Sequence, residues 1–278
     1  MRKNWFYLLF APGLILIVLF LIIPLFSTVA QTFQADGSSG FTLARYFQFF
    51  SDGFTMKIYI RTLNLSLITM LISIILGFPT AYYISKTRKN LKAIYTILAV
   101  FPLLTSPVVR SFSWIVVLGK FGIINNALLN LKIISSPLKL LYNEFSIVIG
   151  LVNLFLPLMI MSLIGVMENI DQDLVEAAES LGASKLKSFL KVVLPLSIPG
   201  LIVGSILVFT GSFTAYTTPQ LLGGNKSKVL ATLIYQNAMT LSDWNAAAMI
   251  ATVMIVTTLI ISVGINKFTA RLQGKGGI

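Results

Sequence analysis

The 278-residue sequence contains no cysteine and no histidine. The first absence excludes a disulfide framework, thiolate chemistry and a zinc site built on sulfur. The second removes the commonest acid–base group and metal ligand of proteins. Charged residues make up 11% of the chain and hydrophobic residues 56%, whereas a soluble domain carries about 25% charged residues. The composition therefore excludes an ordinary globular protein.

Acidic residues are also scarce, because nine Asp and Glu stand against 21 Lys and Arg, giving a net charge of +12. Such a charge is compatible with nucleic-acid binding. The basic residues, however, flank apolar segments instead of clustering on a soluble face, and this distribution is typical of membrane proteins. We therefore expect a lipid bilayer, and no nucleic acid, as the surroundings of this chain.

Six apolar segments have the length of roughly 20 residues that a membrane-spanning helix needs. The first could be a signal peptide, but its apolar region is too long, so we interpret it as an uncleaved span. The sequence predicts an all-α integral membrane protein with one transmembrane domain over residues 1–278. The predicted spans are residues 8–30, 61–85, 93–119, 146–167, 195–218 and 245–266.

Six spans place both termini on one side of the membrane. Lys and Arg are denser in the segments that become cytoplasmic when the termini are cytoplasmic, as the positive-inside rule requires. The clearest of these segments is residues 86–92, which contains Lys86, Arg88, Lys89 and Lys92. We therefore expect a multi-pass membrane protein with both termini in the cytoplasm.

No predicted span contains Asp or Glu. A proton- or cation-coupled carrier usually places ionisable residues in its spans, so this absence weakens that hypothesis. The chain also lacks the phosphate-binding pattern GxxxxGK[ST], so nucleotide chemistry would belong to a partner. Without histidine, cysteine or a carboxylate in a span, a membrane-embedded hydrolase is disfavoured. The sequence indicates a protein that is not an enzyme and holds no metal and no cofactor of its own.

Residues 170–195 form the most polar stretch, and five of the nine acidic residues lie within residues 168–179. The pattern predicts two short helices with a break. Asp171 can cap the first helix, Gly182 can end it, and Ser184 can cap the second. Pro195 can end this pattern and open the next span. Two interpretations remain open at this point: a loop on lipid headgroups, or a docking element for a soluble partner.

The same stretch carries a spaced motif. Glu176-Ala177-Ala178 is followed by three residues, Gly182, nine residues, Val192 and Leu194-Pro195. This motif resembles the EAA loop of ABC importer permeases. The resemblance implies a type I importer fold and a cytoplasmic coupling helix that fits a groove on an ATPase. It also implies that the ATPase-coupling residues are Glu176, Ala177, Ala178, Gly182, Ala183, Leu194 and Pro195.

Other segments resemble the spermidine/putrescine branch of these permeases, and its first permease subunit in particular. They are Phe213-Thr-Ala-Tyr216, Leu222-Gly223-Gly224 and Asp243-Trp244. This resemblance implies a polyamine substrate, with an opine, a phosphonate or another small organic solute as the alternative. Asp243 and Trp244 also have structural interpretations, because an Asp can cap the last span and a Trp can anchor it at the interface.

Four residues are candidates for a substrate path. Arg110 is the ionisable residue deepest in a predicted span, and it either faces the path or snorkels to the interface. Asn153 can contact substrate or hydrogen-bond between helices. Thr214 and Tyr216 lie at the end of the predicted fifth span. They can line a substrate cavity, or they can hydrogen-bond between helices, with Tyr216 at the membrane interface.

The resemblance implies a location in a prokaryotic inner membrane and an assembly of several chains. Its members would be this permease, a second homologous permease, two copies of a cytoplasmic ATPase that binds ATP and Mg²⁺, and a periplasmic or lipid-anchored binding protein. Two rival hypotheses are a stand-alone ion-coupled carrier and a non-transporting membrane scaffold that only docks a partner.

Overall fold

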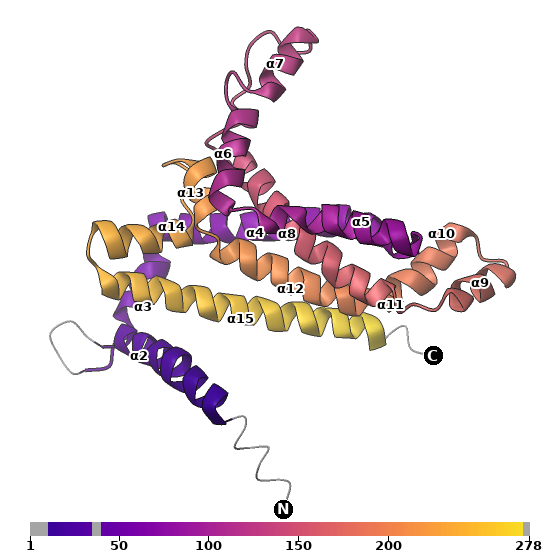
Figure 1. Ribbon diagram of the computed structural model, residues 1–278. Coiled ribbons are helices and arrows are strands. Elements are labelled where there is room, and N and C mark those ends of the chain that lie inside the picture. Colours follow the sequence, from indigo (N-terminus) through magenta and orange to yellow (C-terminus); the bar gives the residue numbers. More distant parts are fainter. Residues whose placement is uncertain (1–10, 35–39, 275–278) are drawn as a thin grey trace, which may run out of the picture. The chain divides into compact units, whose positions relative to one another are not determined.

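The computed structural model describes residues 11–34 and 40–274 (Figure 1). Helices are the regular structure of this part, and a single antiparallel bridge joins Gln34 to Phe41. The predicted all-α class is therefore confirmed. The start of the predicted first span, residues 8–10, lies outside the described residues.

Five helical stretches of the described chain are long and apolar enough to cross a bilayer. A sixth candidate is a broken pair, Lys185–Leu196 and Ile198–Thr214, whose two parts are bent by 63°. The predicted second, fourth and sixth spans fall inside three of the continuous stretches. The five stretches are Ala11–Thr32, Gly53–Lys86, Pro107–Asn130, Glu144–Met167 and Trp244–Lys267.

The predicted third span, residues 93–119, is not one helix. The chain forms α5 (Lys89–Val100), the short 3₁₀ helix η2 (Phe101–Leu104) and α6 (Pro107–Leu118). Ser106 has extended backbone angles before Pro107, because the proline ring disfavours a helical conformation of the preceding residue. The apolar stretch that qualifies as a span here begins at Pro107 and includes α7 (Ile123–Asn130).

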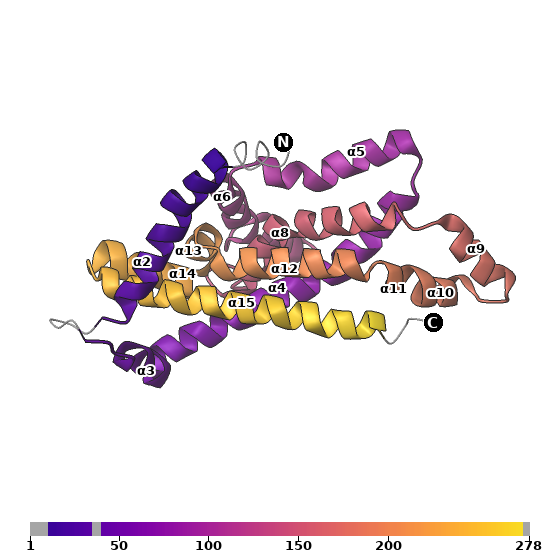
Figure 2. The same ribbon diagram turned by 90° about the horizontal axis from the view of Figure 1, so that it is seen from below.

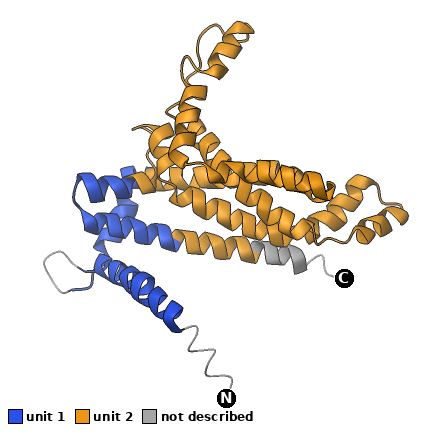
Figure 3. Cartoon of the chain, in the orientation of Figure 1, with its two compact units in different colours: residues 1–57, 233–256 blue, residues 58–232, 257–278 orange. Residues whose placement is uncertain are grey.

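The chain divides into two compact units (Figure 3). Unit 1 comprises residues 1–57 and 233–256. It contains the π-helix η1 (Val18–Ile22), α2 (Ile23–Thr32), α3 (Ala44–Ser51), the π-helix η4 (Gln236–Thr240) and the first part of α15 (Trp244–Gly274). The Thr32 hydroxyl lies 2.5 Å from that of Tyr46 and links α2 to α3. Phe49, Met249 and Ile250 are buried.

Unit 2 comprises residues 58–232 and 257–278 and holds most of α4 (Gly53–Lys86), α8 (Glu144–Met167) and α12 (Ile198–Thr214). α8 and α12 lie side by side (Figures 1 and 2). They are antiparallel, because Gly200 of α12 approaches Ser162 whereas Gly211 approaches Phe155. A side chain at Gly200 would place its Cβ 2.8 Å from the Ser162 carbonyl oxygen. Glycine therefore sets this close helix approach, as in other membrane helix pairs.

Helix α4 satisfies most of its buried hydroxyl groups internally, whereas that of Ser73 has no hydrogen-bond partner among the described residues. Thr62, Ser66 and Thr69 are fully buried, and each donates a hydrogen bond of 2.7–2.8 Å to the carbonyl four residues earlier. Thr62 also accepts a 3.0 Å bond from the backbone of Leu230, the first residue of α14 (Leu230–Tyr235). Polar groups in an apolar medium need such partners, so these residues stabilise packing without forming an aqueous path.

Candidate functional site

The polar loop after α8 has the predicted helix–break–helix form. In α9 (Gln172–Ser180) the Asp171 side chain accepts a 3.1 Å hydrogen bond from the backbone of Asp173. Gly182 has a φ of +87°, a conformation that favours glycine. Ser184 caps α10 (Lys185–Ser188) by accepting a bond from Lys187. The three predicted cap and break positions are confirmed.

The predicted break at Pro195 is wrong. Pro195 lies within α11 (Leu194–Leu196), which continues α10 through the π-helix η3 (Phe189–Val193). The chain bends at Ser197, and α12 begins at Ile198. Pro195 removes only its own N–H donor, while the N–H of Ser197 again bonds to Val193 at 2.9 Å. The helix therefore passes through the proline and ends two residues later than expected.

The motif residues form an open surface at the end of unit 2 (Figure 2). Glu176, Ala177 and Gly182 are exposed, and a Cβ at Gly182 would meet none of the described atoms within 4 Å. Leu181 beside them is 89% exposed. The small side chains therefore leave open space beside the exposed apolar side chain of Leu181.

The remaining motif residues differ in exposure. Ala178 and Ala183 are half-buried. Leu194 packs against the apolar core around α8, whereas Pro195 is exposed. Leu194 therefore attaches the loop to this chain instead of offering a contact surface.

Phe189 connects the loop to α4. Its ring lies edge-on to Phe78, with centroids 5.6 Å apart, and to Tyr82, with centroids 5.0 Å apart. Edge-to-face aromatic pairs at this separation stabilise packing beyond their buried area. A displacement of the loop would therefore reach the α4 helix through this ring.

Two polar contacts also connect the loop to its neighbours. The Lys86 ammonium at the end of α4 donates to the side chain of Gln172. The Lys92 ammonium of α5 lies 3.2 Å from the Glu168 carboxylate after α8. Sequence reasoning missed these contacts and the ring partners of Phe189, because their residues lie far apart in the chain. Basic residues near the ends of predicted spans were the available signal for the two lysines.

The structure does not gather the four candidate path residues into one site. Asn153 lines a cavity of about 390 Å³ between α4, α5 and α8, and its lining also includes Thr80, Tyr83 and Tyr95. Arg110, Thr214 and Tyr216 are not part of that lining. Thr214 donates a 2.8 Å bond to the Thr210 carbonyl of the same helix, so this bond does not join two helices. Tyr216 precedes α13 (Thr217–Gly223).

Arg110 lies in the first turn of α6. Its Nε and Nη1 atoms are buried and have no hydrogen-bond partner among the described residues. A guanidinium in this state suits an acceptor on another molecule. Arg110 therefore remains a candidate for binding an acceptor group of a substrate or of another chain.

The fold is that of a helical membrane-spanning subunit with an exposed loop after α8. Residues 40–271 match the family described as "Binding-protein-dependent transport system inner membrane component". The chain is 30% identical to the spermidine/putrescine transport system permease protein PotB of Escherichia coli (strain K12), over 89% of this chain and 92% of the relative. It is also 30% identical to PotB of Haemophilus influenzae, over 92% of both chains.

A solved structure has a similar fold at 18% identity and a TM-score of 0.80, covering 98% of this chain and 96% of the other. It is described as a bacterial alginate ABC transporter in complex with an alginate-bound periplasmic protein. The chain belongs to the family of binding-protein-dependent transport system inner membrane components. It is a non-catalytic permease subunit of an ABC importer, and ATP hydrolysis belongs to a separate chain.

Proposed function

We propose that this permease imports a polyamine such as spermidine or putrescine. The observation that carries this assignment is the 30% identity to spermidine/putrescine permeases over about nine-tenths of both chains. The chain would form half of the translocation path with a second homologous permease. A periplasmic or lipid-anchored binding protein would deliver the substrate.

The proposed coupling site is the open surface of Glu176, Ala177, Ala178 and Gly182. A groove on an ATPase can approach this surface closely, because small side chains and a positive-φ glycine leave space there. Exposed Leu181 offers an apolar anchor of the kind that helix-in-groove contacts use. Two copies of the ATPase, each binding ATP and Mg²⁺, would serve the two permease subunits.

Coupling requires that the loop move the spans. ATP-driven closure of the ATPase pair would shift α9 and α10, and Phe189 would transmit that shift to Phe78 and Tyr82 of α4. Packed interfaces switch between discrete arrangements instead of deforming continuously. This role places the loop and both termini in the cytoplasm.

The buried guanidinium of Arg110 favours a second candidate substrate. Its Nε and Nη1 atoms have no partner among the described residues, and a guanidinium pairs well with carboxylates and phosphonates. An opine or a phosphonate is therefore the alternative to a polyamine.

Uptake into proteoliposomes tests the proposal. Vesicles would hold the full assembly with internal ATP, and the binding protein would be added outside with spermidine, putrescine, an opine or a phosphonate. We expect ATP-dependent uptake of spermidine or putrescine, and loss of uptake in Glu176→Ala with the assembly intact. Uptake without ATP would contradict the importer mechanism, and uptake of only the anionic solutes would replace the polyamine assignment.

A further inference from the structure

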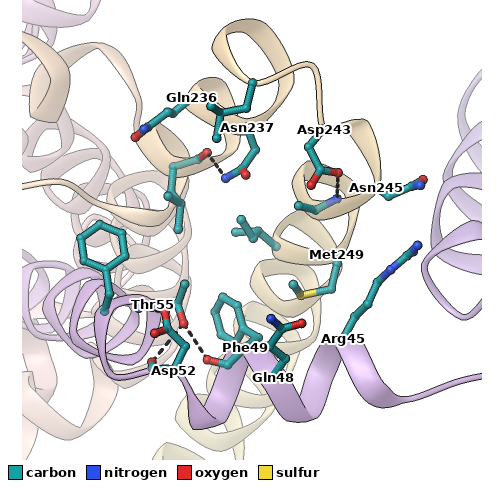
Figure 4. A pocket seen from close by; sticks show the side chains of 15 residues that line it. Arg45, Gln48, Phe49, Asp52, Thr55, Gln236, Asn237, Asp243, Asn245 and Met249 are labelled. Atoms are coloured by element: carbon teal, nitrogen blue, oxygen red, sulfur yellow. Dashed lines mark hydrogen bonds between the residues drawn. The ribbon is translucent and has the colours of Figure 1, made fainter. Parts of the chain in front are cut away.

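Unit 1 contains a cavity that the coupling mechanism does not use (Figure 4). Its volume is about 490 Å³, within the range of roughly 300–1,000 Å³ that holds small organic ligands. One wall comes from α3 and the start of α4, and the other comes from α14, η4 and the start of α15. All of its lining residues belong to unit 1.

The cavity combines an apolar floor with a polar rim. Phe49, Leu233, Met249 and Ile250 are buried among its lining residues. Exposed residues with side-chain acceptors also line it, and they are Gln48, Asp52, Asp243 and Asn245. Such a surface can hold an apolar chain while binding polar groups at its ends.

Two carboxylates line this cavity from opposite walls, Asp52 at the start of α4 and Asp243 at the start of α15 (Figure 4). One oxygen of Asp52 accepts a 2.9 Å bond from the backbone of Thr55, and one oxygen of Asp243 accepts a 2.9 Å bond from that of Ala246. An ionised carboxylate has several acceptor sites, so each can accept further hydrogen bonds from a ligand. Hydrogen bonds from Thr55 lower the pKa of Asp52 below its ordinary value, so this group stays ionised at neutral pH.

These carboxylates are unusual in so basic a chain. Five of the nine acidic residues lie within residues 168–179, and Glu144 lies 2.7 Å from Arg61 in an ion pair. No ion pair is found at Asp52 or Asp243 within the described part of the chain. Arg45 on the rim contributes one positive charge against these two negative charges. The resulting net negative charge favours a cation that binds weakly enough to leave again.

We propose that this cavity is a binding site for an organic amine with two or more ammonium groups joined by methylene segments. Asp52 and Asp243 bind the ammonium groups, and the buried Phe49 and Met249 contact the methylene segment between them. This inference rests on the proposed function and adds a docking point on the permease itself. The described residues contain no group of three metal-binding side chains, so the chemistry favours an amine over a metal ion.

Direct binding to the purified assembly, without its binding protein, tests the site. Equilibrium dialysis with radiolabelled spermidine would compare the wild type with Asp52→Asn and Asp243→Asn. Asparagine caps a helix as well as aspartate does, so each variant removes charge while keeping the cap. We expect each change to weaken binding about tenfold, because each removes one charge-assisted contact. Glu144→Gln is the matched control and should bind like the wild type.

A neutral competitor sharpens the result. Unlabelled putrescine should displace spermidine, whereas 1,4-butanediol should not, because it has the methylene chain without the ammonium groups. Wild-type affinity in the Asp52→Asn/Asp243→Asn double variant, or equal displacement by the diol, would overturn the site.

Parallel uptake measurements separate the two proposals. If the wild type imports spermidine with ATP and the double variant binds it normally, the proposed amine site is wrong and the proposed function stands. If the wild type imports no amine, the substrate assignment fails. If the wild type imports no amine but binds spermidine through the two carboxylates, the amine site is still supported.

Discussion

Small residues serve opposite purposes at the α8–α12 contact and in the coupling loop. At Gly200 a Cβ would lie 2.8 Å from the carbonyl oxygen of Ser162, so the space is filled by this chain itself. At Gly182 a Cβ would meet no described atom within 4 Å, and the positive φ is what requires glycine. The first glycine therefore sets internal packing, and the second shapes a surface that faces outward. This difference distinguishes variants that prevent assembly from variants that prevent coupling.

The largest effect is expected for Gly200→Leu. Its side chain would collide with backbone that cannot rotate away, and overpacking typically costs about 1–3 kcal/mol or more. We expect little assembled transporter in detergent extracts, measured by size-exclusion chromatography. Gly264→Leu is the matched control, because a Cβ at Gly264 meets no described atom within 4 Å. Equal yields of the two variants would contradict the packing role of Gly200.

The next largest effect is expected for Gly182→Val. A β-branched residue at a φ of +87° is strained by roughly 1–3 kcal/mol, so the turn between α9 and α10 should change shape. We expect normal assembly with ATP-driven uptake reduced at least tenfold. Gly182→Asn should retain most uptake, since Asn tolerates positive φ. Equal loss in both variants would assign the effect to side-chain size instead of backbone conformation.

A smaller and more specific effect is expected for Phe189→Ala. The change removes the ring contacts to Phe78 and Tyr82 and leaves the exposed motif surface in place. We expect ATP hydrolysis to continue while the amount of solute imported per ATP falls several-fold. Phe189→Leu, which keeps apolar volume, should lie between this variant and the wild type. An unchanged ratio of uptake to hydrolysis in Phe189→Ala would exclude the ring as the mechanical link.

The smallest effect is expected for Glu168→Gln. The ion pair with Lys92 is 3.2 Å long and partly exposed, with 27% and 39% of the two side chains accessible. Such pairs contribute about 0–1 kcal/mol. We expect thermal unfolding of the purified assembly to shift by only a few degrees and uptake to remain near the wild-type rate. Loss of uptake here would give this pair a functional role that its exposure does not suggest.

Local features of the loop could be predicted from sequence because capping depends on adjacent residues. Asp171, Ser184 and Gly182 illustrate this, as does Asp243, which caps α15 as its structural interpretation expected. The helix break could not be placed, because Pro195 is accommodated by the hydrogen bonding of Ser197.

Features that join distant parts of the chain were not predictable from one sequence. Phe189 meets rings more than a hundred positions earlier, and Asp52 and Asp243 line one cavity. Periodicity identifies an apolar face but does not identify its partner. Arg110 illustrates the same limit. The sequence placed it deep in a span, whereas it lies in the first turn of α6 near the start of the apolar stretch, and its lack of a described partner was not predictable.

Cross-linking from the open loop surface is the most direct test of the coupling mechanism. Because the chain has no cysteine, Ala177→Cys introduces a single thiol that can carry a photoactivatable cross-linker. We predict efficient cross-linking to the ATPase, with a yield that changes when ATP is added. Phe121→Cys, at a residue that is 81% exposed between α6 and α7, should give no ATPase product. Failure of the Ala177→Cys variant to cross-link to the ATPase in an active assembly would contradict the proposed role of the loop.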